Sequence, residues 1–185
     1  RLAASGILLD DNIKKLKLIN DPHGIINLPE GFTYKIISKH KDIMSDGLRV
    51  PSAADGMACF DGSGDNVILI RNHELGYSPF LERVLKDGNP YGKKFYSYIR
   101  KNKNNIYDIK RNSTKCYGGT TTIVYNIKEK KIVNQFLSLS GTLVNCSGGP
   151  TPWGSWISCE ETTKTRKDGF SKDHGFNFEV PAKEK

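Results

Sequence analysis

The sequence predicts an all-β protein built from short strands. Runs of about four to eight residues, rich in β-branched and aromatic side chains, recur along the 185-residue chain. The chain also contains 18 glycines and 8 prolines, many of them between these runs, where turns are expected. From Thr120 onward the runs follow one another closely, which favours antiparallel pairing. Such a succession suggests a sandwich or the blades of a propeller.

The first half of the chain contains three predicted strands between two candidate helices. Asp11–Leu18 can form a short helix with an acidic N-cap. The strands are Thr33–Ser38, Met57–Phe60 and Val67–Ile70. The last of these is apolar throughout, so we expect it to be buried on both faces. Pro79–Lys86 is long enough for two helical turns.

The second half predicts four strands. Gly118–Asn126 and Ile132–Leu139 form a hairpin around the polar turn Lys128–Lys131. Ser155–Cys159 and Gly175–Val180 are the last two strands of the chain.

The stretch Leu143–Glu161 holds two cysteines, two tryptophans, two prolines and a pair of adjacent glutamates. Its prolines exclude a helix, because proline lacks a backbone N–H and has a fixed φ. The stretch therefore predicts an irregular loop that presents Cys146, followed by a strand that ends at Glu160 and Glu161. We expect Trp153 and Trp156 to pack between sheets.

Four polar residues, Arg71 to Glu74, directly follow the apolar run Val67–Ile70. They mark either the edge of a site or a strand end that is solvated by water. Arg71 could contact a phosphate with its guanidinium, or it could pair with a nearby acid. His73 could be a ligand or a hydrogen-bonding neighbour.

The formal net charge of +8 is concentrated in one segment. Lys93–Lys115 contains eight basic residues and one acid, interleaved with tyrosines and a phenylalanine. The segment is interpreted as a solvated surface insertion, as a positive surface that attracts anionic substrates, or as a nucleic-acid-binding surface.

The four cysteines, Cys59, Cys116, Cys146 and Cys159, form no Cys-x-x-Cys pair. This excludes a zinc ribbon or a thioredoxin-type motif. Four cysteines in a chain of this length do not make a disulfide scaffold, although one bridge such as Cys59–Cys116 is compatible with the sequence. No apolar run reaches the roughly 18 residues of a membrane span.

Seven motifs occur in a set order: Leu28-Pro-Glu-Gly-Phe, Asp55-Gly-Met, Arg71-Asn-His-Glu, Gly118-Gly-Thr-Thr-Thr, Asn145-Cys-Ser-Gly-Gly-Pro-Thr-Pro-Trp-Gly-Ser-Trp, Cys159-Glu-Glu and His174-Gly. Together they resemble the PhoX family of bacterial alkaline phosphatases. The resemblance implies a six-bladed, monomeric β-propeller that hydrolyses phosphate monoesters with iron and calcium ions. It also implies twin-arginine export to the periplasm or the medium and a role in phosphate acquisition.

The resemblance also implies site residues. Cys146 would be the thiolate ligand of iron, and Glu74, Glu160 and Glu161 would be carboxylate ligands, with His174 as a further candidate ligand. Neighbours on a regular strand point to opposite faces. Glu160 and Glu161 therefore reach one centre only if the strand ends or bulges there, and otherwise only one of them is a ligand. No catalytic side chain is identified beyond the phosphate contact suggested for Arg71.

Members of the family are about twice as long as this chain or longer. The chain therefore corresponds to roughly the first two or three blades of the family's propeller. We therefore expect residues 1–27 to be a lead-in segment. Residues 28–185 would be the N-terminal part of the domain, with a basic insertion at about 87–115. The 185 residues alone are expected to be inactive and to need further blades, from the same polypeptide or a partner. The alternatives are a non-catalytic propeller that binds or scaffolds, and a nucleic-acid-binding protein.

Overall fold

A computed structural model describes residues 17–77, 87–109 and 115–184 of the chain. The chain divides into two compact units, residues 1–36 and 37–185. The described part consists of three antiparallel sheets with little helix, so the all-β prediction is confirmed. The domain boundary before Leu28 and the propeller stay predictions. None of the described helices is long and apolar enough to cross a membrane.

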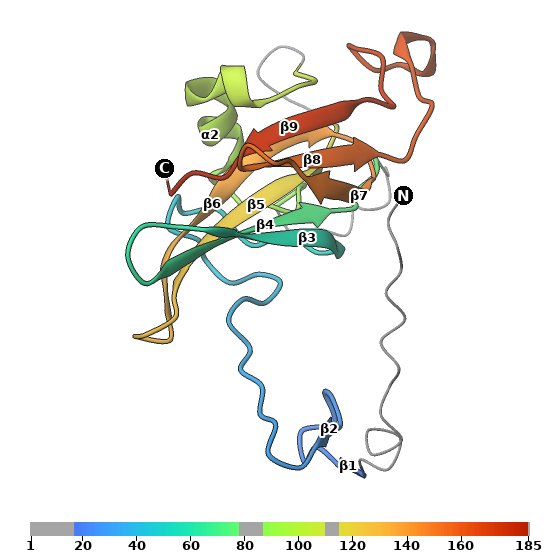
Figure 1. Ribbon diagram of the computed structural model, residues 1–185. Coiled ribbons are helices and arrows are strands. Elements are labelled where there is room, and N and C mark those ends of the chain that lie inside the picture. The colour runs from blue at the N-terminus through green and yellow to red at the C-terminus, as the bar shows by residue number, and fades with distance from the viewer. Residues whose placement is uncertain (1–16, 78–86, 110–114, 185) are drawn as a thin grey trace, which may run out of the picture. The chain divides into compact units, whose positions relative to one another are not determined.

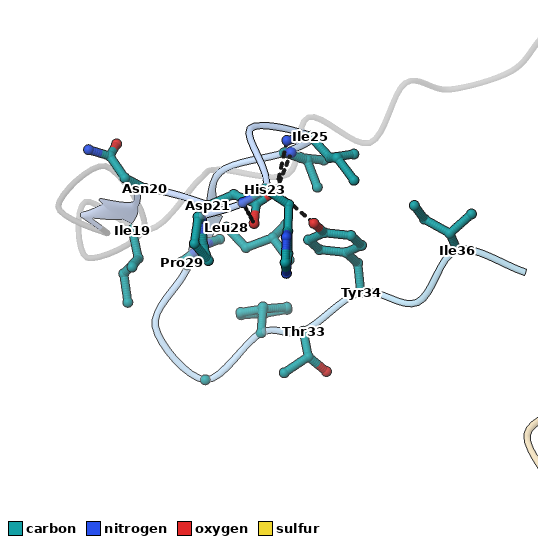
Figure 2. Close-up of a pocket in the computed structure, with 14 residues that line it drawn as sticks. Ile19, Asn20, Asp21, His23, Ile25, Leu28, Pro29, Thr33, Tyr34 and Ile36 are labelled. Carbon is teal, nitrogen blue, oxygen red and sulfur yellow. Dashed lines mark hydrogen bonds between the residues drawn. The ribbon is translucent and has the colours of Figure 1, made fainter.

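The first unit contains a two-stranded hairpin, β1 (Leu18–Ile19) and β2 (Leu28–Pro29). The Asp21 carboxylate organises the turn between them by accepting N–H groups from the following loop and the hydroxyl of Tyr34, at 2.6 Å (Figure 2). The helix predicted for Asp11–Leu18 lies mostly outside the described residues, and its last residue belongs to β1.

A largely apolar pocket of about 650 Å³ lies within this first unit (Figure 2). Its apolar lining includes Ile19, Leu28 and Ile36. None of the site residues predicted from the sequence lines it.

The second unit contains two antiparallel meanders (Figure 1). The first has four strands in sequence order: β3 (Ala54–Asp61), β4 (Asn66–His73), β5 (Gly118–Asn126) and β6 (Lys131–Thr142). The second has three: β7 (Asn145–Pro150), β8 (Ser155–Glu160) and β9 (Asn177–Pro181). In both sheets each strand pairs with the next one along the chain, as strands do in propeller blades. No sheet formed by these strands closes on itself.

Two sequence predictions of this region are wrong. Thr33–Ser38 forms no strand, because no described segment pairs with it and β-propensity is realised only against a partner. The loop predicted before Ser155 contains strand β7. Gly148 makes this pairing possible, because a Cβ atom there would collide with the carbonyl oxygen of Ile157 on β8.

The tryptophan prediction is half right. Trp156 is buried between the two meanders, where it packs against Ile68 and Ile70 of β4. Trp153 is 71% exposed instead, because it lies in the turn between β7 and β8. Its indole N–H donates to Glu179 at 2.7 Å.

Asn72 of β4 joins the two meanders through a buried side chain. Its Nδ2 donates to the carbonyl oxygen of Ser147, and its Oδ1 accepts from Trp156 Nε1 and Ser158 Oγ at 2.9 and 2.8 Å. One amide side chain of the first meander therefore bonds to three groups of the second. A buried network of this kind fixes one relative position of the two sheets.

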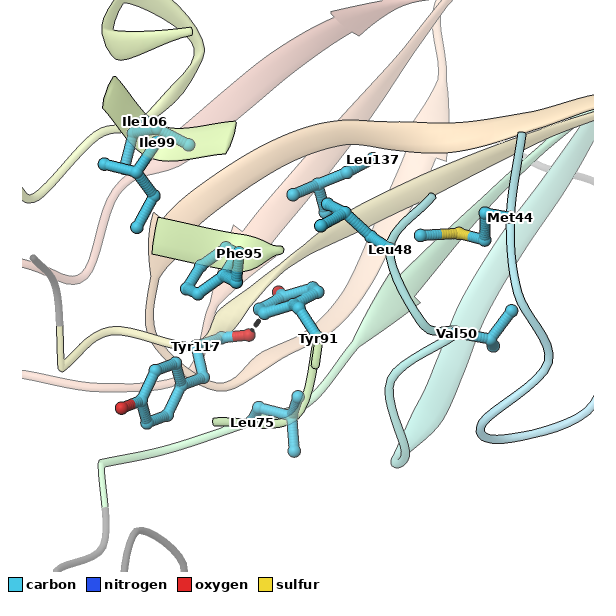
Figure 3. Packing of buried hydrophobic residues seen from close by; sticks show 10 residues of the cluster. All are labelled: Met44, Leu48, Val50, Leu75, Tyr91, Phe95, Ile99, Ile106, Tyr117 and Leu137. Atoms are coloured by element: carbon cyan, nitrogen blue, oxygen red, sulfur yellow. Dashed lines mark hydrogen bonds between the residues drawn. The ribbon is translucent and has the colours of Figure 1, made fainter. Parts of the chain in front are cut away.

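A second hydrophobic core involves the opposite side of the first meander, where helix α2 (Phe95–Lys101) packs (Figure 3). Phe95 and Ile99 are fully buried in it, while Arg100 is exposed. Tyr91 stacks on Phe95 with ring centroids 4.3 Å apart. The basic segment Lys93–Lys115 thus contains an amphipathic helix, which is followed by the 3-10 turn η2 (Lys103–Asn105). A second 3-10 turn, η3 (Arg166–Asp168), lies between β8 and β9. The helix predicted for Pro79–Lys86 lies outside the described residues.

Candidate metal centre

The two meanders begin with the same backbone arrangement. Ala53, just before β3, has φ of 51°, and Val144, just before β7, has φ of 52°. Positive φ is unusual for residues other than glycine, and it is a marked outlier for a β-branched one such as Val144. Strain of this kind costs about 1–3 kcal/mol per residue and concentrates at functional sites.

In each meander the carbonyl of the strained residue accepts the N–H of a glutamate that follows the second strand. Glu74 donates to Ala53 and Glu161 donates to Val144, both at 2.8 Å. Two residues after each strained position stands a second candidate ligand, Asp55 in β3 and Cys146 in β7. The side chains of Asp55 and Glu74 are within hydrogen-bonding reach of each other, as are those of Cys146 and Glu161.

These two ligand pairs meet where β3 passes β7. A Cβ atom on Gly56 would lie 2.9 Å from the carbonyl oxygen of Cys146, so glycine at this position allows the close approach of the two strands. The N–H of Val144 donates to the carbonyl of Leu75 at 3.0 Å, which ties the second pair to the segment after Glu74. The two pairs therefore lie near enough for the charge of Glu161 to act on Glu74.

The cluster Asp55–Glu74–Cys146–Glu161 combines crowded negative charge with access to solvent. A hydrogen bond to Asp55, desolvation and the charges of Asp55 and Glu161 raise the pKa of Glu74 above its ordinary value. Burial and the charge of Glu161 raise the pKa of the Cys146 thiol. Asp55 and Glu161 are exposed, whereas Glu74 and Cys146 are half-buried. A bound cation would relieve the repulsion and favour the thiolate.

Glu160 points away from this cluster into a second, buried one, as strand alternation allows. Its carboxylate accepts the N–H groups of Leu143, Gly175 and Phe176 at 2.8, 2.6 and 3.1 Å. Nδ1 of His174 lies 2.7 Å from it as well. Four partners occupy the lone pairs of one carboxylate.

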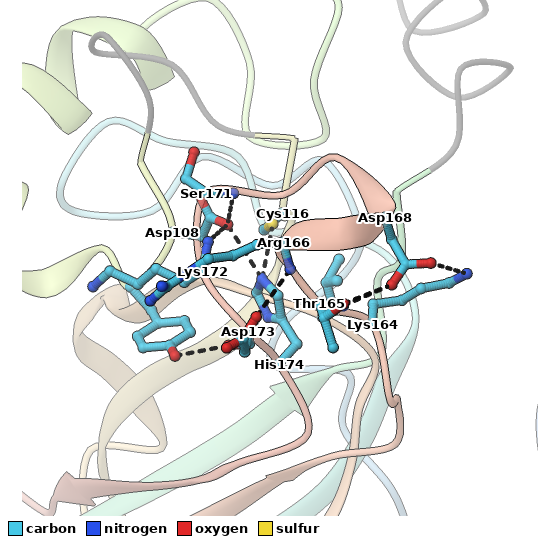
Figure 4. Close-up of polar contacts among 12 residues, drawn as sticks. Asp108, Cys116, Lys164, Thr165, Arg166, Asp168, Ser171, Lys172, Asp173 and His174 are labelled. Atoms are coloured by element: carbon cyan, nitrogen blue, oxygen red, sulfur yellow. Dashed lines mark hydrogen bonds and ion pairs between the residues drawn. The ribbon is translucent and has the colours of Figure 1, made fainter.

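His174 brings Asp108 and Cys116 into this buried cluster (Figure 4). Its Nε2 lies 3.3 Å from Asp108 Oδ2 and 3.6 Å from Cys116 Sγ. Burial lowers the pKa of His174, but contacts with Asp108, Cys116 and Glu160 outweigh burial and raise this pKa to about 11. The same contacts, with backbone N–H groups, hold the pKa values of Asp108 and Glu160 below their usual range despite burial.

Arg71 and His73 lie on the other face of β4 from Asn72. Arg71 donates to Ser38 Oγ at 3.2 Å and, more weakly, to Thr121 Oγ1 at 3.5 Å. His73 bridges the carbonyl of Ser52 and Thr121 Oγ1, both at 2.9 Å, and burial lowers its pKa to about 4. None of these hydrogen bonds joins Arg71 or His73 to Asp55, Glu74, Cys146 or Glu161.

Sequence reasoning missed three residues of these clusters. Asp55 belongs to the motif Asp55-Gly-Met, but the sequence does not mark it as a candidate ligand, because its place beside Glu74 depends on how β3 packs against β7. Asp108 is the sole acid of the basic segment Lys93–Lys115, which was a usable signal. Cys116 was considered only for a disulfide with Cys59. The structure leaves both cysteines unbridged, with Cys59 exposed and Cys116 buried.

Glu160→Gln is expected to destabilise the fold by about 2–4 kcal/mol at neutral pH, because it removes a buried charge that neutralises His174. The folded-state pKa of Glu160 is depressed, so its stabilising effect is present above the unfolded pKa of about 4.3 and is lost as the pH falls through the folded value. Denaturant unfolding at several pH values should show the difference from wild type shrinking in acid. Glu161→Gln, the neighbouring control, should show no such loss, and equal losses in both variants would contradict the assignment.

No curated protein and no solved structure matches the chain. The family model described as alkaline phosphatase PhoX matches residues 14–185, a range that includes both clusters and nearly the whole chain. With its seven ordered motifs and its mainly antiparallel β-structure, the chain belongs to the PhoX family of alkaline phosphatases.

Proposed function

We propose that this chain carries part of a metal centre that hydrolyses phosphate monoesters, with Asp55, Glu74, Cys146 and Glu161 as ligands. The observation that carries the proposal is an arrangement that occurs in both meanders. In each, a residue with positive φ precedes the first strand, its carbonyl accepts the N–H of a glutamate, and a second candidate ligand stands two residues after it. Membership of an alkaline phosphatase family supports the reaction class. The proposed metals are iron and calcium.

The donor set fits these ions. Three carboxylates supply the hard oxygen ligands that calcium and ferric iron take, and one thiolate adds a softer ligand suited to iron. The hydrogen bond to Asp55 raises the pKa of Glu74 and burial raises the pKa of Cys146, and nearby carboxylates add to both shifts, a repulsion that a multivalent cation offsets. When bound, such ions neutralise charge on the phosphoryl oxygens and acidify water for attack on phosphorus.

The protein's own contribution is positioning. The backbone N–H groups of Glu74 and Glu161 donate to the carbonyls of Ala53 and Val144, and these hydrogen bonds fix the backbone from which the two carboxylate side chains extend. Asn72 fixes the meanders against each other through its three hydrogen bonds, two of them buried. The exposure of Asp55 and Glu161 leaves one side of the cluster open to a phosphate ester. Preorganised groups of this kind lower the cost of binding a charged transition state.

The remaining parts of the proposal follow from the family resemblance. Further ligands and substrate contacts come from additional propeller blades, and the enzyme acts in the periplasm or outside the cell. Arg71 is retained as a candidate phosphate contact only if its side chain leaves Ser38, because its present partners lie on the other face of β4.

Metal analysis and turnover of p-nitrophenyl phosphate at alkaline pH test the proposal on the intact enzyme. We expect bound iron and calcium, and turnover that is lost on chelation and restored by both ions. The 185-residue chain alone should show no turnover. A folded intact protein with neither metal nor turnover after reconstitution would contradict the proposal and favour the non-catalytic propeller. Salt-sensitive binding of single-stranded DNA would instead favour the nucleic-acid alternative.

A further inference from the structure

The buried cluster around His174 has the composition of a transition-metal site. Asp108, Cys116 and His174 are 4, 1 and 6% exposed, and their ligand atoms all lie within 4.8 Å of one another. Asp108 and Cys116 are near each other in the sequence, and the loop before β9 brings His174 to them from 58 residues further along the chain (Figure 4). None of them belongs to the exposed cluster proposed to bind iron and calcium.

The separations match those of ligands around one tetrahedral ion. Bond lengths of about 2.3 Å to sulfur and 2.0–2.1 Å to nitrogen or oxygen place a sulfur and a nitrogen ligand roughly 3.5 Å apart, and a nitrogen and an oxygen ligand roughly 3.3 Å apart. Cys116 Sγ and Asp108 Oδ2 lie 3.6 and 3.3 Å from Nε2 of His174. A charge-assisted hydrogen bond from nitrogen to carboxylate is usually shorter, about 2.7–2.9 Å, as the one to Glu160 is at 2.7 Å.

The groups behind these ligands are also those of a metal site. A histidine ligand usually presents one nitrogen to the metal while a carboxylate or carbonyl accepts from the other. Glu160 takes that position on Nδ1 and leaves Nε2 facing Asp108 and Cys116. Asp108 is oriented in turn by the backbone N–H groups of Ser171 and Lys172, at 2.9 and 3.0 Å.

We propose that Asp108, Cys116 and His174 bind a structural Zn²⁺ ion, with Glu160 orienting the histidine. Thiolate, imidazole and one carboxylate form a borderline-soft set that suits zinc, whereas calcium takes six to eight oxygen ligands. The second carboxylate oxygen of Asp108 can complete four-coordination. The ion would join the segment before β5 to the loop before β9. This site does not depend on the proposed phosphatase function.

Cobalt substitution tests this site. The chain is stripped with a chelator and titrated with Co²⁺, whose thiolate complexes show a near-ultraviolet charge-transfer band and, when tetrahedral, strong visible bands. We expect one equivalent of Co²⁺ to produce these bands and one equivalent of Zn²⁺ to abolish them. Cys116→Ser should abolish the charge-transfer band, and Glu160→Gln should weaken Zn²⁺ binding about 10–100-fold.

Cys146→Ser is the matched control, because Cys146 is the thiol of the other cluster. It should leave the band unchanged. A band lost in Cys146→Ser and kept in Cys116→Ser would overturn the zinc site, and so would a folded wild-type chain that gives no band at one equivalent of Co²⁺. If Cys116→Ser does not fold, wild type and Cys146→Ser are compared first, because a full band in both leaves only Cys116, the half-buried Cys159 and the exposed Cys59 as the thiolate ligand. Cys159→Ser and Cys59→Ser then both have to retain the band, and loss of the band in either variant would overturn the zinc site.

Discussion

Cys146→Ser is expected to lower turnover of phosphate monoesters by the intact enzyme at least about 100-fold and to remove bound iron. A serine hydroxyl is a much weaker ligand than a thiolate at neutral pH, and the replaced side chain stands beside Glu161 where the two ligand pairs meet. Metal analysis and kinetics on the same preparation check the result. Calcium content should fall less than iron content, because calcium takes oxygen ligands.

Cys59→Ser is the control for this experiment. Cys59 lies on β3, the same strand as Asp55, but it is exposed and unbridged. Its replacement should leave metal content and turnover within about twofold of wild type, since surface substitutions rarely change the structure. Full iron content and full turnover in Cys146→Ser would show that Cys146 is not a ligand.

Asn72→Ala is expected to destabilise the fold by about 3–5 kcal/mol. The change removes two buried hydrogen bonds and one partly buried one, and leaves Trp156 Nε1 and the carbonyl of Ser147 without their partner. Total stabilities of about 5–15 kcal/mol are usual, so this loss approaches the limit of the fold. Urea unfolding followed by tryptophan fluorescence measures it, because Trp156 lies at the affected interface.

Asn104→Ala is the matched control, because Asn104 lies in the exposed turn η2. Its stability should stay within about 0.5 kcal/mol of wild type. An Asn72→Ala variant as stable as Asn104→Ala would mean that the side chain of Asn72 does not hold the two meanders together.

The strands were predictable where pairing is local. Gly118–Asn126 was predicted with the bounds of β5, and its hairpin with β6 was also found, because turn and strand signals adjoin in sequence. β7 was missed because its glycines and Pro150 contradict β-propensity. The pairing of β7 depends on its close contact with β8, and at position 148 only glycine avoids a collision with the carbonyl oxygen of Ile157. Val67–Ile70 was placed correctly in β4, but only alternate residues are fully buried.

The site was predictable only where a motif carries it. Motif resemblance led to Glu74, Cys146 and Glu161, and in the structure the charge of Glu161 acts on both other side chains. It also led to Glu160 and His174, which the structure places in the buried cluster instead. The left-handed backbone of Val144 could not be predicted, because a β-branched residue avoids that conformation unless surrounding contacts impose it. Asp55 likewise depends on long-range packing of β3 against β7.

The most direct test of the metal centre is an anomalous difference map from crystals of the intact enzyme, measured on both sides of the iron absorption edge. We expect an iron peak at bonding distance from Cys146 Sγ and from at least one carboxylate of Asp55, Glu74 and Glu161. An active, iron-containing crystal with its iron peak away from these four side chains would contradict it.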